Sequence, residues 1–427
     1  MIDSILFFIL LVCGIGFFIR NSKKIIAAIH LGTPLVKVDR KKERWVQMFR
    51  LAFGQQKMHR NLLVGLLHLI VYLGFIIINI ELLEIIIDGL LGTHRIFKDL
   101  GVFYDFSIAT FEIFAFLVVV SVVVFWMRRN VMRIARFWSV EMKGWPKSDA
   151  NWILIIEFVL MVLFLTMNAA DYALQLKGYE AYPLAGVFPV SASLEPFMSQ
   201  FSIDSLVIIE RSAWWLHIIG ILFFLNYLYY SKHLHILLAF PHTFYSSLEP
   251  KGKMHNNEVV TAEVKLMLGL PADPVSSEEV SFGAKDVTNL SALQLLGAFS
   301  CTECGRCTAA CPANQTGKLL SPRKIMMDTR DRATDLIEKS GAVKEHFLLD
   351  KYISREELWA CTTCNACVEE CPIGISPMSV ILSMRQYITM EEASSPSELN
   401  SMMTNIENNG APWPFNNEDR LKWIDPS

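Results

Sequence analysis

The sequence predicts an all-α membrane protein, and three observations lead to this fold class. Hydrophobic residues make up 52% of the 427 residues and charged residues only 19%, a more apolar balance than that of most water-soluble domains. Apolar residues concentrate before residue 240, whereas eight of the nine cysteines lie after residue 300. Five apolar stretches have roughly the 20 residues that a membrane helix needs. The chain therefore divides into a membrane half and a soluble half.

The five predicted membrane helices cover residues 4–19, 61–83, 107–127, 151–170 and 205–230. The first is short enough to resemble a signal peptide, but no Lys or Arg precedes it and no small-residue cleavage site follows it. We therefore expect an uncleaved first span, in which Cys13 is interpreted as a packing residue.

Basic residues predict the orientation of the membrane half. Lys and Arg crowd residues 20–60 and 128–147, whereas the two alternate loops contain only Arg95, Lys98 and Lys177. Because cytoplasmic loops carry an excess of Lys and Arg, the N-terminus is expected outside the cytoplasmic membrane. Five spans then place everything after Lys232 in the cytoplasm.

Four segments are expected along the chain: a membrane domain (1–240), a polar linker (241–290), a soluble domain (291–390) and a C-terminal tail (391–427). The linker includes a short helical stretch at 259–268, and the tail shows little periodicity. Within the soluble domain, residues 322–360 alternate charged and apolar residues at helical spacing. We expect this domain to be helical as well.

The soluble half contains two copies of one cysteine pattern. The first reads Cys301-Thr-Glu-Cys304-Gly-Arg-Cys307-Thr-Ala-Ala-Cys311-Pro312, and the second reads Cys361-Thr-Thr-Cys364-Asn-Ala-Cys367-Val-Glu-Glu-Cys371-Pro372. This spacing is that of the ligand run in bacterial [4Fe–4S] ferredoxins. Zinc also uses Cys-x2-Cys pairs, but it would leave the third and fourth cysteine of each run unexplained. Reduced thiolates in such arrays suit a cytosolic compartment.

The spacing also predicts which cysteines share a cluster. Three closely spaced cysteines wrap three corners of one cubane, and the fourth ligates the other cluster. One cluster is therefore assigned to Cys301, Cys304, Cys307 and Cys371, and the second to Cys361, Cys364, Cys367 and Cys311. The segment between the two copies is helical in pattern, which favours an α-helical ferredoxin-like domain with two [4Fe–4S] clusters over the small β-sheet of short ferredoxins.

Histidines in the membrane half are candidate axial ligands of b-type haem, because imidazole is a haem ligand. His217 and His235 are 18 residues apart, so they would share one face of a continuous fifth helix. Antiparallel spans two and five pair His68 with His217 toward the outside and His59 with His235 toward the cytoplasm. Two stacked haems would follow.

Several alternatives to this haem arrangement stay open. His59 and His68 are nine residues apart and so lie on opposite faces of an ideal helix. A bulge, an unwound start near residues 55–60 or helix tilt would bring the two histidines to one face. Otherwise only one haem is ligated, or another inner histidine such as His30 or His242 takes the place of His59. Interfacial histidines without haem are the simplest alternative.

These motifs together resemble a known combination of modules. The five-helix order and the pattern His217-x17-His235 resemble the cytochrome b subunit of respiratory nitrate reductase. The second half resembles heterodisulfide-reductase-related membrane proteins. The residues that carry this second resemblance are Ser231-Lys232-His233-Leu234-His235-Ile236 with Phe240-Pro241, Leu295-Leu296-Gly297-Ala298-Phe299-Ser300 before the first cysteine run, and Pro412-Trp413 with Arg420 and Trp423.

The resemblance implies the electron-transfer component of a membrane oxidoreductase in a respiratory chain. Electrons would pass between a cytoplasmic donor, two [4Fe–4S] clusters, b haems and the quinone pool. Many members of the family carry their terminal redox chemistry on Cys-Cys-Gly modules, a pattern that this sequence lacks. A Cys-Cys-Gly redox partner or a soluble flavoprotein or ferredoxin is therefore expected. A haem-free quinone-linked protein and an iron–sulfur redox sensor or assembly protein are the alternative functions.

Overall fold

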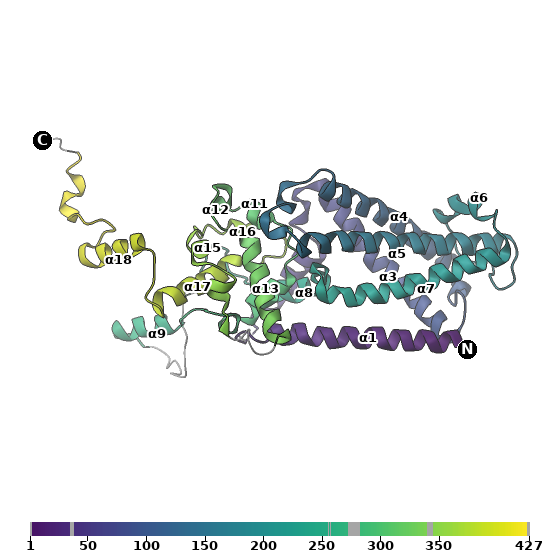
Figure 1. The fold of residues 1–427 in the computed structure, drawn as a ribbon, viewed down its shortest axis with the longest axis horizontal. Helices are drawn as coiled ribbons and strands as arrows, with labels where there is room; N and C mark the ends of the chain where they lie inside the picture. The colour runs from purple at the N-terminus through teal and green to yellow at the C-terminus, as the bar shows by residue number, and fades with distance from the viewer. Residues whose placement is uncertain are drawn as a thin grey trace.

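A computed structural model of the chain describes residues 2–34, 38–254, 256, 258–271, 282–339 and 345–424. These residues form α-helices, short 3-10 helices, one π-helical turn and two isolated β-bridges, with no β-strand among them. Figure 1 shows a long helical bundle with a smaller helical domain at one end, while the N-terminus lies at the opposite end of the bundle. We call these the cluster end and the distal end of the bundle.

Five helices are long and apolar enough to cross a membrane, so the five predicted spans are confirmed. They are α1 (Ile2–Ile29), α3 (Leu62–Leu91), α4 (Val102–Asn130), α5 (Trp145–Leu176) and α7 (Ile203–Tyr227). Each begins before the predicted start or ends beyond the predicted end, because polar residues continue the helix outside the apolar stretch. The α3 helix begins after Asn61, whose side chain accepts a hydrogen bond from the Val64 amide at 3.2 Å.

The five long helices pack as a ring. Helix α1 contacts α3 and α7, α4 contacts α3 and α5, and α5 contacts α7. Helices α3 and α7 are thus not neighbours in this ring. The membrane-facing surface stays apolar, with many exposed Leu, Ile, Val and Phe side chains along α1 and α3. Such a surface is stable only in lipid.

An aromatic segment lies at the cluster end. It consists of α2 (Lys41–Met48) and the π-turn Phe49–Phe53, and we call it the interfacial segment. Trp45, Phe49 and Phe53 follow one another at helical spacing and are 51%, 54% and 40% exposed. The rings of Trp45 and Phe53 also contact α8 (His235–Tyr245). Exposed aromatic rings beside Lys and Arg are typical of a helix that lies in the membrane interface.

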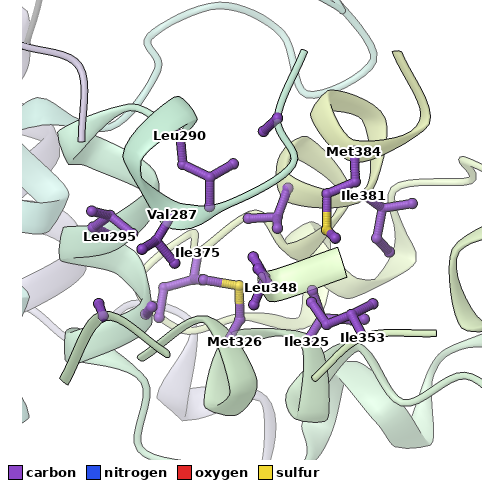
Figure 2. Packing of buried hydrophobic residues seen from close by; sticks show 14 of the residues in the cluster. Val287, Leu290, Leu295, Ile325, Met326, Leu348, Ile353, Ile375, Ile381 and Met384 are labelled. Atoms are coloured by element: carbon purple, nitrogen blue, oxygen red, sulfur yellow. The ribbon is translucent and has the colours of Figure 1, made fainter. Parts of the chain in front are cut away.

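The domain at the cluster end has its own hydrophobic core (Figure 2). Its helices are α10 (Ala292–Ser300), α11 (Arg306–Ala309), α12 (Pro312–Gln315), α13 (Pro322–Glu338), α14 (Leu348–Lys351), α15 (Arg355–Trp359), α16 (Ala366–Glu370) and α17 (Pro377–Met390). Leu295, Ile325 and Ile381 lie at the centre of the core, together with Val287 and Leu290 from the segment before α10. Part of the expected linker therefore packs inside this domain.

The core of the cluster-end domain continues onto the membrane helix α1. Ile25 and Ala28 at the end of α1 belong to the same buried cluster. Just beyond, Thr33 exchanges backbone hydrogen bonds of 2.8 Å with Leu290 and Ala292. A side chain at Gly32 would collide with Leu290, because an added Cβ would lie 2.7 Å from its carbonyl oxygen. The domain is thus fixed to the bundle by packing as well as by the chain.

Helices outside the two main bodies are short or exposed. They are α6 (Glu195–Met198) in a distal loop, α9 (Glu258–Met267) at the predicted helical stretch, and α18 (Ser397–Asn409). The α18 helix lies in the tail, where the sequence indicated little periodicity. None of its described residues is buried.

Candidate iron–sulfur and haem-ligand sites

The two cysteine loops repeat one another in backbone conformation. Glu303 and Thr363, each two residues after the first cysteine of a run, both have φ of 54°. Gly305 and Asn365, each following the second cysteine, have φ of 72° and 62°. Left-handed conformations are uncommon for non-glycine residues, so two matched pairs mark a duplicated local fold. In both loops a short helix, α11 or α16, then carries the third cysteine.

Local contacts account for the residues at these left-handed positions. A side chain at Gly305 would meet the guanidinium of Arg323, since an added Cβ would lie 2.4 Å from its Nη1 atom. Only glycine fits there. At the matched position in the second loop stands Asn365, and asparagine is one of the few non-glycine residues that enter the left-handed region routinely.

The thiols of the first run gather with the last cysteine of the second run. Burial raises the pKa of the Cys301 thiol to about 12, and Cys304 and Cys371 add to this rise as neighbouring thiolates. The pKa of Cys307 is also raised by burial, and Cys301, Cys304 and Cys371 raise it further. These four cysteines therefore lie within electrostatic reach of one another.

The second group consists of the first three cysteines of the second run and the last cysteine of the first run. Burial raises the pKa of Cys367 to about 12, with added contributions from Cys361 and Cys311. Burial also raises the pKa of Cys361, and the thiols of Cys311 and Cys364 act in the same direction. Cys311, the last cysteine of the first run, thus lies with the second run. The crossed cluster assignment stays a prediction, since Cys307 of the first group also lies within electrostatic reach of Cys367 of the second.

The chemistry of both groups fits a [4Fe–4S] cluster. Thiols whose pKa is raised by burial and by neighbouring cysteines, such as Cys301 and Cys367, are held as thiolates only if positive charge lies among them, which the irons of a cluster provide. Backbone amides also point at sulfur: the amide of Thr363 donates to Cys361 Sγ at 3.4 Å and that of Ile375 to Cys371 Sγ at 3.3 Å. All nine cysteines are free thiols, and within the described ranges no three metal-binding side chains converge as a single-ion site.

The second-run loop is bound to the segment just before α3. Lys57 Nζ donates to the carbonyl oxygens of Glu369 at 2.8 Å and of Cys371 at 3.1 Å. Arg60 forms ion pairs of 2.5 Å with both Glu369 and Glu370. Positive charge at the C-terminal end of α16 also complements the helix dipole.

The first-run loop is bound through buried ion pairs. Arg323, which is fully buried, donates to the Arg136 carbonyl at 2.7 Å and pairs with Glu141 at 2.7 Å. Glu303, in the loop itself, pairs with Lys232 and with Arg330, the latter at 2.8 Å. These partners lie far apart in the sequence and follow no short spacing, so the sequence offers no signal that would have found them.

The four predicted haem ligands lie in unequal surroundings. His59 is exposed in the 3-10 turn Met58–Arg60, before α3 begins. His68 lies inside α3, within electrostatic reach of His235 and of Arg306 next to the first cysteine run. His235 is the first residue of α8, with the ring of His233 centred 5.4 Å away. His217 is buried in α7 against Phe164.

The structure therefore differs from the expected pairing of His68 with His217 and of His59 with His235. His68 is six residues into α3, about 9 Å from the cluster end, whereas His217 lies ten residues, about 15 Å, before the end of α7. In addition, α7 ends at Tyr227 and Ser231 is extended, so His217 and His235 do not share one continuous helix. His68 consequently lies within electrostatic reach of His235, and His59 lies in the turn before α3.

Three of these histidines have the orientation that metal-bound imidazoles adopt. Nδ1 of His217 donates to the Leu160 carbonyl at 3.0 Å, and Nδ1 of His235 to the Lys232 carbonyl at 3.2 Å. Nδ1 of His68 bonds the Gln55 amide oxygen at 2.9 Å. A ligating histidine usually holds its other ring N–H in this way, which directs Nε2 toward the metal. The residues thus fit axial ligation at His68, His217 and His235, and His59 shows no such bond among the described residues.

The distal end contains a buried polar network that spacing alone did not indicate. Arg95 pairs with Asp171 at 2.5 Å and donates to Tyr104 and Asn168. Nearby, Glu112 accepts hydrogen bonds from the backbone amides of residues 190 and 191 at 2.9 and 3.1 Å. The network ties a distal loop to α4 and α5.

Comparison with known proteins shows that the chain is similar to iron–sulfur proteins. The model of the 4Fe-4S dicluster domain matches residues 300–375, which include both cysteine runs. "Probable iron-sulfur-binding oxidoreductase FadF" of Bacillus subtilis is 27% identical over 99% of this chain and 61% of its own length. "EtfAB:quinone oxidoreductase" of Syntrophomonas wolfei is 25% identical over 91% of this chain and 54% of its own length.

A further match covers a smaller part of the chain. One of the polypeptides that make up the ferredoxin:CoB-CoM heterodisulfide reductase of Methanosarcina mazei is 38% identical over 21% of this chain and 46% of its own length. The chain is a homologue of iron–sulfur oxidoreductases and heterodisulfide reductase subunits. This iron–sulfur oxidoreductase homologue spans a little more than half the length of the first two relatives. No solved structure matches it. The resemblance of its membrane half to the nitrate reductase cytochrome b subunit stays a prediction.

Paired serine substitutions test the crossed cysteine grouping. In Cys307→Ser/Cys371→Ser both changes fall on one cluster, so about four of eight irons per chain should remain. In Cys307→Ser/Cys311→Ser the changes fall on different clusters, and iron content should drop well below that value. Iron and acid-labile sulfide analysis of the purified variants measures both. The opposite ranking would show that each run holds its own cluster.

Proposed function

We propose that this protein passes electrons between a soluble donor on the cytoplasmic side and the membrane quinone pool. The observation that carries the proposal is the position of the two cysteine groups, which sit on the end of a five-helix membrane bundle and are bound to it by Lys57, Arg60, Arg323 and Lys232. [4Fe–4S] clusters in these groups supply one-electron transfer.

The cluster end is proposed to face the cytoplasm. Loops at this end contain most of the basic residues of the membrane half, whereas the distal loops hold Arg95, Lys98 and Lys177. An excess of Lys and Arg is the usual mark of cytoplasmic loops. Since the N-terminus lies at the distal end of the bundle, it would be outside (Figure 1).

Quinone is proposed as the membrane-soluble substrate, and quinone reduction as the direction. One relative that aligns with 91% of this chain is named for EtfAB and quinone together. The donor would accordingly be a soluble flavoprotein or ferredoxin, or a Cys-Cys-Gly redox protein. In this arrangement the membrane domain ends at residue 240 and the tail begins after residue 390. The cluster domain would then lie between the soluble donor and the lipid bilayer.

A b-type haem is proposed at the cluster end, with His68 and His235 as its axial ligands. Such a haem would add a one-electron carrier inside the bundle. His68 and His235 lie within electrostatic reach of each other, and each has its Nδ1 bonded to a carbonyl oxygen. His217 has the same orientation deeper in the bundle, where it would serve a second haem.

Reoxidation of the clusters by quinone tests the proposed function. The full chain in liposomes is reduced with limiting dithionite, and a short-chain quinone is then added without oxygen. The visible absorbance of the oxidised clusters should recover in proportion to the quinone. Cys364→Ser, with one damaged cluster, is the matched control and should recover less absorbance. Clusters that stay reduced in excess quinone would exclude the proposal and favour a sensing role.

Histidine substitutions test the haem ligands independently of quinone. His68→Leu and His235→Leu should each abolish the reduced α-band of a cluster-end haem, because each removes one axial bond. His59→Leu is the matched control and should retain the band, since His59 is exposed before α3. Reduced-minus-oxidised optical spectra of purified protein provide the measurement. A wild-type protein without an α-band would leave the haem-free alternative as the correct account.

A further inference from the structure

A cavity of about 1100 Å³ lies at the cluster end, where three parts of the chain meet. One wall is the interfacial segment, a second is the end of α8 with the turn after it, and the third is the cluster domain. Asn365 and Ile375, which line the third wall, belong to the loops that carry Cys364 and Cys371. The cavity therefore reaches from the interfacial segment to the loops around the clusters.

Two polar side chains in this cavity lack hydrogen-bond partners. His242, at the end of α8, is only 3% exposed; its ring lies beside the backbone of Gly374, but neither ring nitrogen makes a hydrogen bond of good geometry among the described residues. The amide oxygen of Asn365 is buried and likewise without a partner in the described part of the chain. A buried polar group without a partner costs about 1–3 kcal/mol, so such groups usually await a ligand or water.

The charge of these groups narrows the class of ligand. Burial lowers the pKa of His242 to about 4, although the nearby backbone of Gly374 opposes this effect, so the ring is neutral near pH 7. A neutral imidazole offers one N–H donor and one acceptor.

Of the cations that line the cavity, three lysines are already bound, whereas Lys42 and Arg50 have no ion pair within the described part of the chain. Lys57 donates to carbonyl oxygens, Lys251 pairs with Glu369, and Lys253 pairs with Glu249 at 2.9 Å. The two unpaired groups inside, His242 and Asn365, are neutral. A neutral ligand matches these two groups inside the cavity.

The apolar side chains of the cavity and the neighbouring interfacial segment indicate a ligand that is partly apolar. Val46, Leu51, Leu293, Met326, Met378 and Leu382 line the cavity between its polar groups. The exposed rings of Trp45, Phe49 and Phe53 belong to the same segment as Val46 and Leu51, and their exposure is that of a helix resting in the membrane interface. An apolar ligand dissolved in the bilayer thus has a short route to this cavity.

We propose that this cavity binds the head group of a quinone, with His242 donating to a quinone carbonyl and Asn365 accepting from the hydroxyl of the quinol. The proposal rests on the proposed function and assigns its quinone site to the cluster end. A quinone carries hydrogen-bond acceptors in its oxidised form and donors in its reduced form, and the two unpaired side chains match both. Its isoprenoid tail would lie along the apolar wall toward the interfacial segment.

Binding of a quinol analogue tests the site without depending on electron transfer. The probe is 2-heptyl-4-hydroxyquinoline N-oxide, and the quenching of its fluorescence is titrated against the purified full chain in detergent. His242→Leu should weaken binding about tenfold or more, the effect of one lost hydrogen bond to a buried ligand. His242→Gln, which keeps an N–H donor, should bind with intermediate strength.

Asn365→Gly provides a second variant that the backbone accepts. The matched position in the first loop is Gly305, and glycine adopts the left-handed conformation without strain. This variant should also weaken binding several-fold while its cluster absorbance is unchanged. His30→Leu, at a position just after α1 and outside the cavity lining, is the matched control and should bind as the wild type does.

Two results would overturn the proposal. Unchanged affinity in Asn365→Gly and His242→Leu with intact clusters would show that the probe binds elsewhere, as would photolabelling by an azidoquinone confined to distal residues. Reoxidation of the clusters separates the two hypotheses. If the wild type is reoxidised by quinone and the cavity variants match it, the site is wrong and the proposed function stands. If the wild type itself is not reoxidised, the proposed function fails.

Discussion

Neighbouring thiolates repel one another when water is excluded, and this constraint applies to the cysteine loops of the cluster domain. Burial and neighbouring thiols raise the pKa of Cys301, Cys307 and Cys367, so without compensating positive charge the loops would hold protonated thiols. A cluster removes this cost and is itself held by both repeats, since Cys371 joins the first run and Cys311 the second. The two loops are therefore expected to order together, and the core of Figure 2 is completed by the segments between them.

A second constraint is the attachment of this domain to the membrane bundle. Helix α1 supplies Ile25 and Ala28 to the domain core, while buried or half-buried cations from the bundle loops bind the cysteine loops directly. Lys57 contacts the carbonyl of a cysteine, and Lys232 contacts Glu303 between two cysteines. A domain attached at these points cannot rotate freely over the bundle. The distances between redox sites are thus set by packing, which is what fast electron transfer through fixed sites requires.

Patterns with a fixed period were predicted well from the sequence, and contacts between distant residues were not. The five spans and the two-cluster domain follow from hydropathy and from cysteine spacing, which are local properties, and the crossed cysteine grouping stays a prediction. The histidine pairing stays a prediction, but the continuous fifth helix that it assumed is interrupted at Ser231, and α3 starts only after His59. Arg323 and Lys232 were not found because each bonds partners far away in sequence. Val287 and Leu290 were assigned to a linker because only the fold shows that they are core.

Iron and acid-labile sulfide analysis, combined with EPR of the dithionite-reduced protein, tests the central claim most directly. Two cubanes on eight thiolates predict about eight irons and eight sulfides per chain, with the signals of two neighbouring reduced [4Fe–4S] clusters. Neighbouring clusters are expected because Cys307 of one group lies within electrostatic reach of Cys367 of the other. A colourless protein that contains zinc, or neither iron nor sulfide, would contradict the account.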